Sequence, residues 1–179
     1  MFTGIIQKIG VVKFVENRGD AISMCVIAHD FFKDCQLGDS IANDGVCLTI
    51  ESCTDSKAVF CLMHQTLSNT TFQNITVGTK LNLEKACALN TPMGGHFVTG
   101  HVDSVARVLR ITPRETGVEV DLELPSSLRR YVISKGSIAL NGISLTVAQK
   151  EQEFIRGRTI PGTLERTNLT DWKVATLAW

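Results

Sequence analysis

The chain has 179 residues, of which 44% are hydrophobic and 20% are charged, and its 18 basic and 18 acidic residues leave no net charge. This composition favours a folded globular protein over a disordered one. Lysine and arginine form no basic stripe, so nucleic acid is not an expected partner. The start of the chain lacks the pattern of a secretion signal, and its uncharged stretches are too polar to cross a bilayer. We therefore expect a cytoplasmic protein with no membrane partner.

The six cysteines do not form a metal-binding pattern. None belongs to a C-x-x-C pair, and none has a histidine at the spacing of a zinc site. We expect no metal site, and in the cytoplasm most of these cysteines would be buried, unpaired side chains.

Short β-rich runs are found along the whole chain. In chain order, we expect strands over residues 10–15, 21–27, 58–63, 118–124 and 138–147, and short helices over residues 29–35 and 126–133. The dipeptides Asp44-Gly45 and Asn141-Gly142 are typical of tight hairpin turns. About six strands and one short helix in each half predict an all-β fold of small, closed antiparallel barrels of the Greek-key type.

The chain contains an internal repeat. Residues 41–50 match residues 138–147, which lie 97 positions later, and residues 3–4 match residues 99–100 at an offset of 96. A period of this length indicates two domain-sized copies rather than a solenoid of short repeats. Residues 89–95 contain the proline, asparagine and paired glycines of a linker. We therefore expect an N-terminal barrel over residues 1–88, a linker over 89–95 and a C-terminal barrel over 96–179.

Five motifs occur in order and in register with this repeat. They are MFTGII at residues 1–6, DGVCLT at 44–49, GGHFVTGHVD at 94–103, NGISLT at 141–146 and TLERT at 163–167. Together they resemble riboflavin synthases of the alpha-chain type over nearly the whole chain, with the non-catalytic lumazine proteins as close relatives.

The resemblance implies two homologous six-stranded Greek-key β-barrels that each bind one lumazine. It also implies a transferase that needs no cofactor. One molecule of 6,7-dimethyl-8-ribityllumazine gives a four-carbon unit to a second, and the products are riboflavin and 5-amino-6-ribitylaminouracil. The implied assembly is a homotrimer, and lumazine synthase is a candidate partner.

The resemblance further implies one ligand site in each half. The N-terminal site would use Gly4, Ile5, Ile6, Ser40, Cys47, Leu48, Thr49, Cys61, Leu62, Met63, His64, Gln65 and Thr66. The C-terminal site would use Gly100, His101, Val102, Lys135, Ser144, Leu145, Thr146, Ile160, Pro161, Gly162, Thr163, Leu164 and Glu165.

The implied reaction needs a base that takes a proton from a lumazine methyl group and a nucleophile that adds to the neighbouring ring carbon. The two lumazines react in opposite roles, so we expect the catalytic groups where the two halves differ. Cys47 stands where the second copy has Ser144, and its thiolate could add to the electrophilic carbon or hydrogen-bond with it. His101 stands where the first copy has Ile5, and it could move the methyl proton near neutral pH. Cys47, His101 and Ser144 are therefore the candidate catalytic residues.

Each of these assignments has a structural alternative. Cys47 could be an ordinary buried cysteine of a strand, and His101 could be a structural histidine. We interpret His96 as structural rather than catalytic. The hydroxyls of Ser40, Thr49 and Thr146 suit the alternating polar edge of a uracil-like ring, whereas isolated threonines in strands often reflect β-propensity alone.

The chain departs from the family pattern at three places. Asn141 stands where an aspartate is more common, and Gly162 stands where a larger polar residue is more common. The sequence reaches Trp179 without the C-terminal helix that assembles the family's trimer. We therefore expect a weak trimer. The short end is similar to that of the lumazine proteins, so the alternative function is a non-catalytic lumazine- or flavin-binding antenna or carrier.

Overall fold

The first half of the chain folds into a closed six-stranded barrel. The computed structural model describes residues 1–179. The first six strands are β1 (Lys8–Asn17), β2 (Ala21–Ile27), β3 (Ser40–Asn43), β4 (Val46–Thr54), β5 (Lys57–Met63) and β6 (Lys80–Lys85). They pair antiparallel in the closed order β1-β2-β5-β4-β3-β6. Buried and more exposed residues alternate along β5, because successive side chains of a strand point to opposite faces.

The second half repeats this arrangement. Its strands are β7 (Ala106–Arg114), β8 (Gly117–Glu123), β9 (Ser137–Leu140), β10 (Ile143–Lys150), β11 (Phe154–Thr159) and β12 (Leu177–Ala178), in the order β12-β7-β8-β11-β10-β9. The two six-stranded, barrel-like sheets confirm the predicted fold class and the tandem repeat. The second sheet is left open between β9 and β12, because β12 has only two residues where β6 has six.

The helices do not lie where the sequence analysis placed them. Residues 29–34 form turns, and Asp30 has a φ of 58°, which a right-handed helix does not tolerate. The segment 126–133 contains only the 3-10 turn η2 (Ser126–Leu128). The α-helices that form are α1 (His64–Asn69) and α2 (Pro161–Arg166), which follow β5 and β11 at equivalent places in the repeat. Each leads into a 3-10 turn, η1 (Thr71–Asn74) or η3 (Asn168–Asp171).

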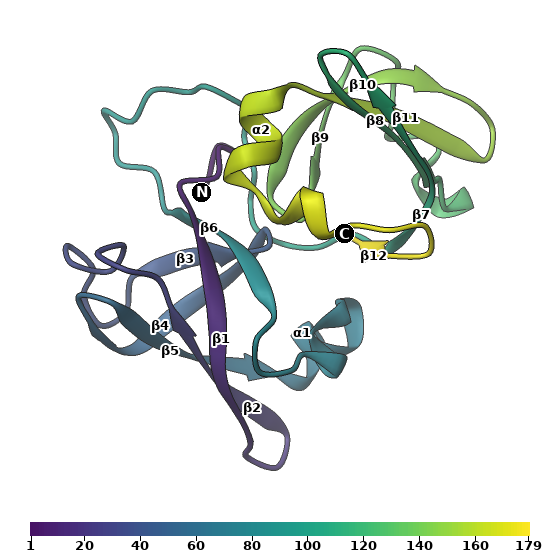
Figure 1. Ribbon diagram of the computed structural model, residues 1–179. Coiled ribbons are helices and arrows are strands. Elements are labelled where there is room, and N and C mark those ends of the chain that lie inside the picture. Colours follow the sequence, from purple (N-terminus) through teal and green to yellow (C-terminus); the bar gives the residue numbers. More distant parts are fainter.

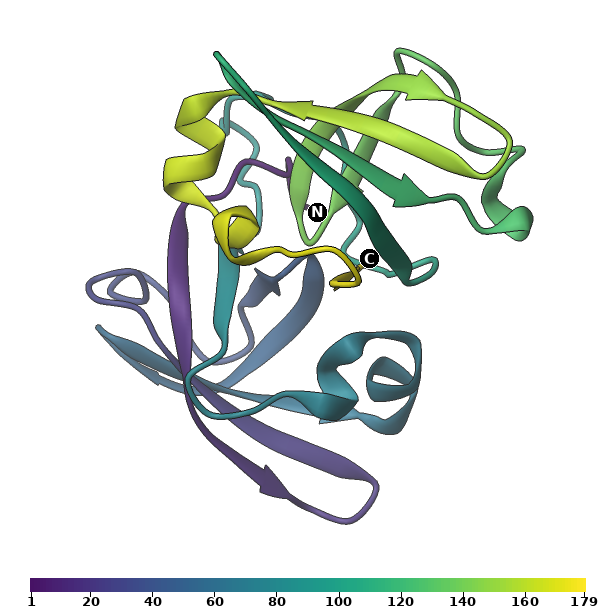
Figure 2. The ribbon, with the colours of Figure 1, turned by 45° about the vertical axis from the view of Figure 1, so that its right-hand side comes forward.

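The two barrels lie side by side, with the C-terminal residues between them (Figure 1). Each barrel has its own apolar core. Trp179 packs with the core of the first barrel, and its ring meets that of Phe72 edge-on with centroids 5.2 Å apart. The turned view in Figure 2 shows the N-terminal segment beside the β9–β10 hairpin of the second barrel. The two halves are therefore joined at their termini as well as through residues 86–105.

A buried polar cluster also joins the barrels. Asn82, on β6, donates from its side chain to the Asn141 carbonyl at 3.0 Å and to the Asn168 side chain at 2.9 Å. Asp44 accepts from the Asn82 N–H at 2.6 Å and from the Asn168 side chain at 2.9 Å. Burial raises the pKa of Asp44 to about 7, although these hydrogen bonds act in the opposite direction. The interface therefore favours the protonated form of this carboxyl group.

None of the helices has the length and apolar character needed to cross a membrane.

Candidate functional site

Two hairpins at equivalent places in the repeat carry the candidate catalytic side chains. Cys47 lies on β4 of the first barrel, and Ser144 lies on β10 of the second. Both are half-buried on the outer surface of their barrels, whereas the next residues, Leu48 and Leu145, are buried in the two cores. The predicted ligand contacts of Leu48 and Leu145 can therefore come only from their backbone atoms.

The strand register places hydroxyl groups beside both residues. Ser40 pairs with Thr49 across the β3–β4 hairpin, on the same face as Cys47. Ser137 pairs with Thr146 across the β9–β10 hairpin, on the same face as Ser144. Each hairpin thus presents two hydroxyls next to its thiol or hydroxyl, as a polar heterocycle would require. Ser137 was not among the residues predicted from the sequence, although the repeat relates it to Ser40.

The turns of the two hairpins meet back to back. Asp44 and Gly45 in one turn, and Asn141 and Gly142 in the other, all have φ values between 46° and 83°. A Cβ atom built on Gly45 would lie 2.6 Å from the Gly142 N atom, and one built on Gly142 would lie 2.7 Å from the Gly45 N atom. Only glycines allow this approach, so the contact fixes how the two hairpins are placed.

Each hairpin is covered by a segment from the opposite half of the sequence. The Ser144 N–H donates to the Gly4 carbonyl at 2.8 Å, and the Cys47 N–H donates to the Gly100 carbonyl at 2.9 Å. Phe2 and Val98 pair with each other between these two contacts. The sequence analysis grouped Gly4 with Cys47 and Gly100 with Ser144, whereas the structure brings Gly4 to Ser144 and Gly100 to Cys47. The N-terminal segment lies against the second barrel, and residues 98–100 lie against the first.

Ser144 has a histidine partner that the sequence analysis did not anticipate. The Nδ1 atom of His96 lies 2.7 Å from the Ser144 Oγ atom. Burial lowers the pKa of His96, so its imidazole is neutral at pH 7 and one ring nitrogen can accept a hydrogen bond. Gly95 allows the approach, since a Cβ atom there would lie 3.0 Å from the same Oγ atom and 2.0 Å from the Thr3 carbonyl oxygen. The Gly-Gly-His sequence at residues 94–96 was the available signal for this pair.

Cys47 has a different environment. No side chain forms a hydrogen bond with its thiol, and Gly100 packs directly on it, since a Cβ atom on Gly100 would lie 2.5 Å from the Cys47 Cβ atom. His101, the other predicted catalytic residue, has an exposed side chain and donates only its backbone N–H, to Thr99. The structure therefore gives a histidine partner to Ser144 and none to Cys47.

The remaining predicted ligand residues lie at the ends of β5 and β11 and in the helices that follow. Met63 and Ile160 are exposed at equivalent positions, with 60% and 66% of their surfaces accessible. Leu62 points into the first core and is fully buried. The other predicted residues of these segments are exposed, half-buried or, at Gly162, without a side chain: Cys61, His64, Gln65, Thr66, Pro161, Gly162, Thr163, Leu164 and Glu165. Elsewhere in the chain, Ile5 is exposed, Val102 is half-buried and Ile6 is buried in the second core.

Lys135 lies in the turn before β9, where its N–H donates to the Val147 carbonyl. Its φ of 64° is unusual for a lysine, and the equivalent residue of the first half is Gly38, with a φ of 89°. The exposed Lys135 side chain is free to reach toward the outer face of the β9–β10 hairpin.

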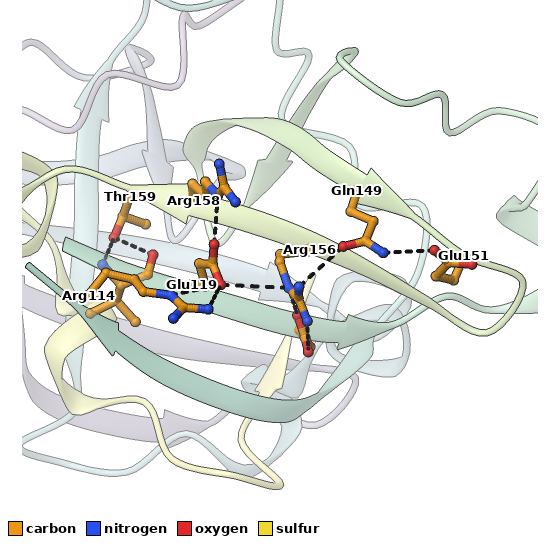
Figure 3. A network of polar contacts seen from close by, with 9 residues as sticks. Arg114, Glu119, Gln149, Glu151, Arg156, Arg158 and Thr159 are labelled. Carbon is orange, nitrogen blue, oxygen red and sulfur yellow. Dashed lines mark hydrogen bonds and ion pairs between the residues drawn. The ribbon is translucent and has the colours of Figure 1, made fainter. Parts of the chain in front are cut away.

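A charged network distinguishes the outer face of the second barrel (Figure 3). Arg156 donates to Asp121 at 2.6 Å, and Glu119 accepts from Arg158 at 2.7 Å and from Arg114 at 2.6 Å. The hydrogen bonds from Arg114 and Arg158 hold the pKa of Glu119 below its usual value. The first barrel has neutral residues at the places equivalent to Glu119, Asp121, Arg156 and Arg158, namely Ser23, Cys25, Val59 and Cys61. The outer faces of the two barrels thus differ in charge over these strands.

Comparisons with known proteins agree with this arrangement. The chain matches the lumazine binding domain family twice, over residues 3–86 and 99–177. It is 37% identical over 167 residues to riboflavin synthase of Bacillus subtilis, a match that covers 93% of this chain and 78% of that protein. It is also 37% identical over 180 residues to riboflavin synthase of Mycobacterium bovis, covering 98% of this chain and 90% of that one.

Solved structures show the same fold. A crystal structure of LumP complexed with riboflavin superposes with a TM-score of 0.90 at 26% identity, covering 99% of this chain and 97% of that one. LumP complexed with 6,7-dimethyl-8-(1'-D-ribityl) lumazine superposes with a TM-score of 0.89 at 25% identity and the same coverage. With two family matches in tandem and curated relatives over nearly its full length, the chain belongs to the lumazine binding domain family.

Proposed function

We propose that the protein is a riboflavin synthase. In this reaction, one 6,7-dimethyl-8-ribityllumazine transfers a four-carbon unit to another, and riboflavin and 5-amino-6-ribitylaminouracil are formed. The observation that carries the proposal is the unequal pair of sites on two otherwise matching hairpins. Ser144 is hydrogen-bonded to His96 at 2.7 Å, whereas Cys47 at the equivalent place has no polar side-chain partner. A dismutation needs this inequality, because its two identical substrates must react in opposite roles.

In the proposed mechanism, proton transfer takes place in the C-terminal site. The neutral His96 accepts the proton of the Ser144 hydroxyl, and the activated oxygen then interacts with the lumazine bound there. In the N-terminal site, the Cys47 thiol contacts the electrophilic ring carbon of the second lumazine. Ser40 and Thr49 in one site, and Ser137 and Thr146 in the other, would hold the polar edges of the rings.

We further propose that the reacting pair of sites forms between two copies of the chain. Phe2, Ala42 and Val98 form a small buried cluster, with Cys47 and Ala139 packed against it, so protein atoms fill the space between the two hairpins. Two lumazines could not stack face to face through this cluster. Facing sites from two subunits would avoid it, and a trimer is the assembly that we propose.

The experiment that tests the function is direct. Purified protein is incubated with an excess of 6,7-dimethyl-8-ribityllumazine, and riboflavin is measured by its absorbance and fluorescence. We expect riboflavin to form without added metal or nucleotide, at the same rate in the presence of a chelator. Tight lumazine binding with no riboflavin formed would overturn the proposal.

The second candidate function is a lumazine- or flavin-binding antenna or carrier. The observation that favours it is the similarity to LumP complexed with lumazine, riboflavin and flavin mononucleotide, with TM-scores of 0.89, 0.90 and 0.88. The same incubation separates the two functions. A carrier would shift or quench the lumazine emission in proportion to the protein added, whereas an enzyme would convert many lumazines per chain.

A further inference from the structure

The dipeptide Thr3-Gly4 supports the backbone of both members of the His96–Ser144 pair. The His96 N–H donates to the Thr3 carbonyl at 3.0 Å. The Ser144 N–H donates to the Gly4 carbonyl at 2.8 Å. The distance of 2.7 Å between the two side chains therefore depends on where residues 3 and 4 lie.

Glu84, on β6 of the first barrel, fixes this dipeptide. Its Oε1 atom accepts from the Thr3 N–H at 2.6 Å and from the Thr3 hydroxyl at 2.7 Å, and its Oε2 atom accepts from the Gly4 N–H at 2.9 Å. The Thr3 hydroxyl oxygen also accepts from the Ile5 N–H at 3.2 Å. Gly4 has a φ of 75°, so the chain turns directly at these contacts. Both carboxylate oxygens thus hold residues 3–5 in one conformation.

The Glu84 carboxylate is not explained by the core of the first barrel. The residue is 2% accessible, whereas its strand neighbours Leu81 and Leu83 supply apolar side chains to that core. All the hydrogen bonds to its carboxylate come from residues 3 and 4. Burying a carboxylate is costly, and donors of this kind offset that cost. What the carboxylate provides in return is a fixed position for residues 3–5.

We propose that Glu84 is a positioning residue of the C-terminal site, acting through residues 3 and 4 on the contact between His96 and Ser144. The inference rests on the function proposed for this site. The Glu84 side chain belongs to the other barrel and is buried, so it sets the geometry of the pair rather than contacting the reacting atoms. Proton transfer needs hydrogen-bond distance, and a displacement of about 1 Å can lower a rate about a hundredfold.

The N-terminal site does not depend on this carboxylate in the same way. The Cys47 N–H donates to the Gly100 carbonyl at 2.9 Å, and no hydrogen bond links the Glu84 side chain to residues 98–100. In the sheet, Ala42 stands between Glu84 and Cys47. Loss of the carboxylate should therefore affect the two sites unequally, whereas a general loosening of the fold would affect both.

The test compares Glu84→Gln with the parent protein. Glutamine keeps the shape of the side chain, but the amide nitrogen that replaces one carboxylate oxygen cannot accept from a backbone N–H. Riboflavin is the probe, and its binding is followed by fluorescence anisotropy. The amide signals of Thr49 and Thr146 in NMR spectra report which site is filled. We expect the affinity of the C-terminal site to fall about tenfold and that of the N-terminal site to stay nearly unchanged.

A second readout follows the pair itself. Burial lowers the pKa of His96, so a pair that opens to water should titrate closer to 6.5, the usual pKa of histidine. NMR of the His96 ring against pH would show this rise in Glu84→Gln. If the role of Glu84 were only structural, the melting temperature would fall while this pKa and both affinities stayed the same. Neither readout depends on turnover, so a parent protein that forms no riboflavin would overturn the proposed function without affecting this test.

Two variants of Thr3 serve if Glu84→Gln does not fold. Thr3→Val removes one of the three hydrogen bonds to the carboxylate, so it should weaken the C-terminal site several-fold. Thr3→Ser keeps the hydroxyl and should bind riboflavin nearly as the parent does. Glu51→Gln, at an exposed glutamate of β4, is the matched control and should change neither readout. Equal losses at the two sites, or an unchanged C-terminal affinity and His96 pKa in the folded variants, would overturn the proposal.

Discussion

The Nδ1 atom of His96 lies 2.7 Å from the Oγ atom of Ser144, and these two residues come from different segments of the second half of the chain. Their contact is the clearest difference between the two candidate sites. It leads to a test of whether they act as one unit in the proposed reaction.

We expect His96→Asn and Ser144→Ala each to lower the rate of riboflavin formation by about tenfold or more. The rate of the double variant should be only slightly below that of the less active single variant. Residues that act together show this non-additivity, because either change removes the same function. Single-turnover rates of the four proteins would measure it. His29→Asn, at an exposed histidine, is the control. Fully additive effects would mean that the two side chains act independently.

Cys47→Ser should affect chemistry more than folding. The equivalent position in the second barrel already holds Ser144, so a hydroxyl fits this place on the hairpin. We expect an unchanged melting temperature and a fall in turnover of about tenfold or more. Thermal unfolding and steady-state kinetics on the same preparation would check both parts. Equal turnover of the variant and the parent would remove Cys47 from the proposed mechanism.

Two inactive variants should restore activity when they are mixed. Cys47→Ala damages the N-terminal site, and Thr146→Ala damages the C-terminal site. If the reacting sites face each other between subunits, some mixed oligomers contain one intact site of each kind. Activity per chain should also rise with protein concentration, because only the oligomer would be competent. Subunit exchange is shown separately with labelled protein, and no recovery under exchange would place the reaction within one chain.

The contribution of Asp44 to the stability of the protein should fall as the pH rises from about 4 to about 7. Asp44 has a pKa of about 7 in the fold and a usual value of 3.8, so the folded state holds its proton over a range where the unfolded chain releases it. The largest loss that this group can cause is about 4 kcal/mol. Asp44→Asn keeps an oxygen that can accept from Asn82 and Asn168, and it removes the ionisation. Urea unfolding at several pH values should show a smaller loss for the variant, and parallel curves would contradict this account of Asp44.

Gly142→Ala should destabilise the protein by about 1 to 3 kcal/mol, because the new methyl group meets the Gly45 backbone and the residue keeps a positive φ. Gly19→Ala is a matched control with the same φ of 75° and no atom within 4 Å of the new methyl group. The difference between the two variants in the free energy of unfolding, measured with denaturant, gives the energetic cost of separating the two hairpin turns. Equal destabilisation would show that this contact does not hold the barrels together.

The sequence predicted the repeat and much of the strand structure, because strands and Asp-Gly or Asn-Gly turns are encoded by neighbouring residues. Strand β2 spans residues 21–27, as predicted. The sequence did not predict which hairpin residues 3–4 and residues 99–100 cover. Thr3-Gly4 and Thr99-Gly100 have the same local pattern, and packing against the near barrel or the far one leaves that pattern unchanged. The contact between His96 and Ser144 was missed for the same reason, since it depends on how segments 48 residues apart meet.

The contacts of residues 2–4 with the second barrel and of residues 98–100 with the first join the two halves in addition to the linker. Each hairpin donates a backbone hydrogen bond to a carbonyl of the other copy of the repeat, at Gly4 or Gly100. If the chain were cut within residues 89–95, neither fragment would carry both a hairpin and the segment that covers it. The hairpin of a single half could be covered only by the equivalent segment of another molecule. The two copies of the repeat are therefore alike in fold, and each depends on the other to cover its hairpin.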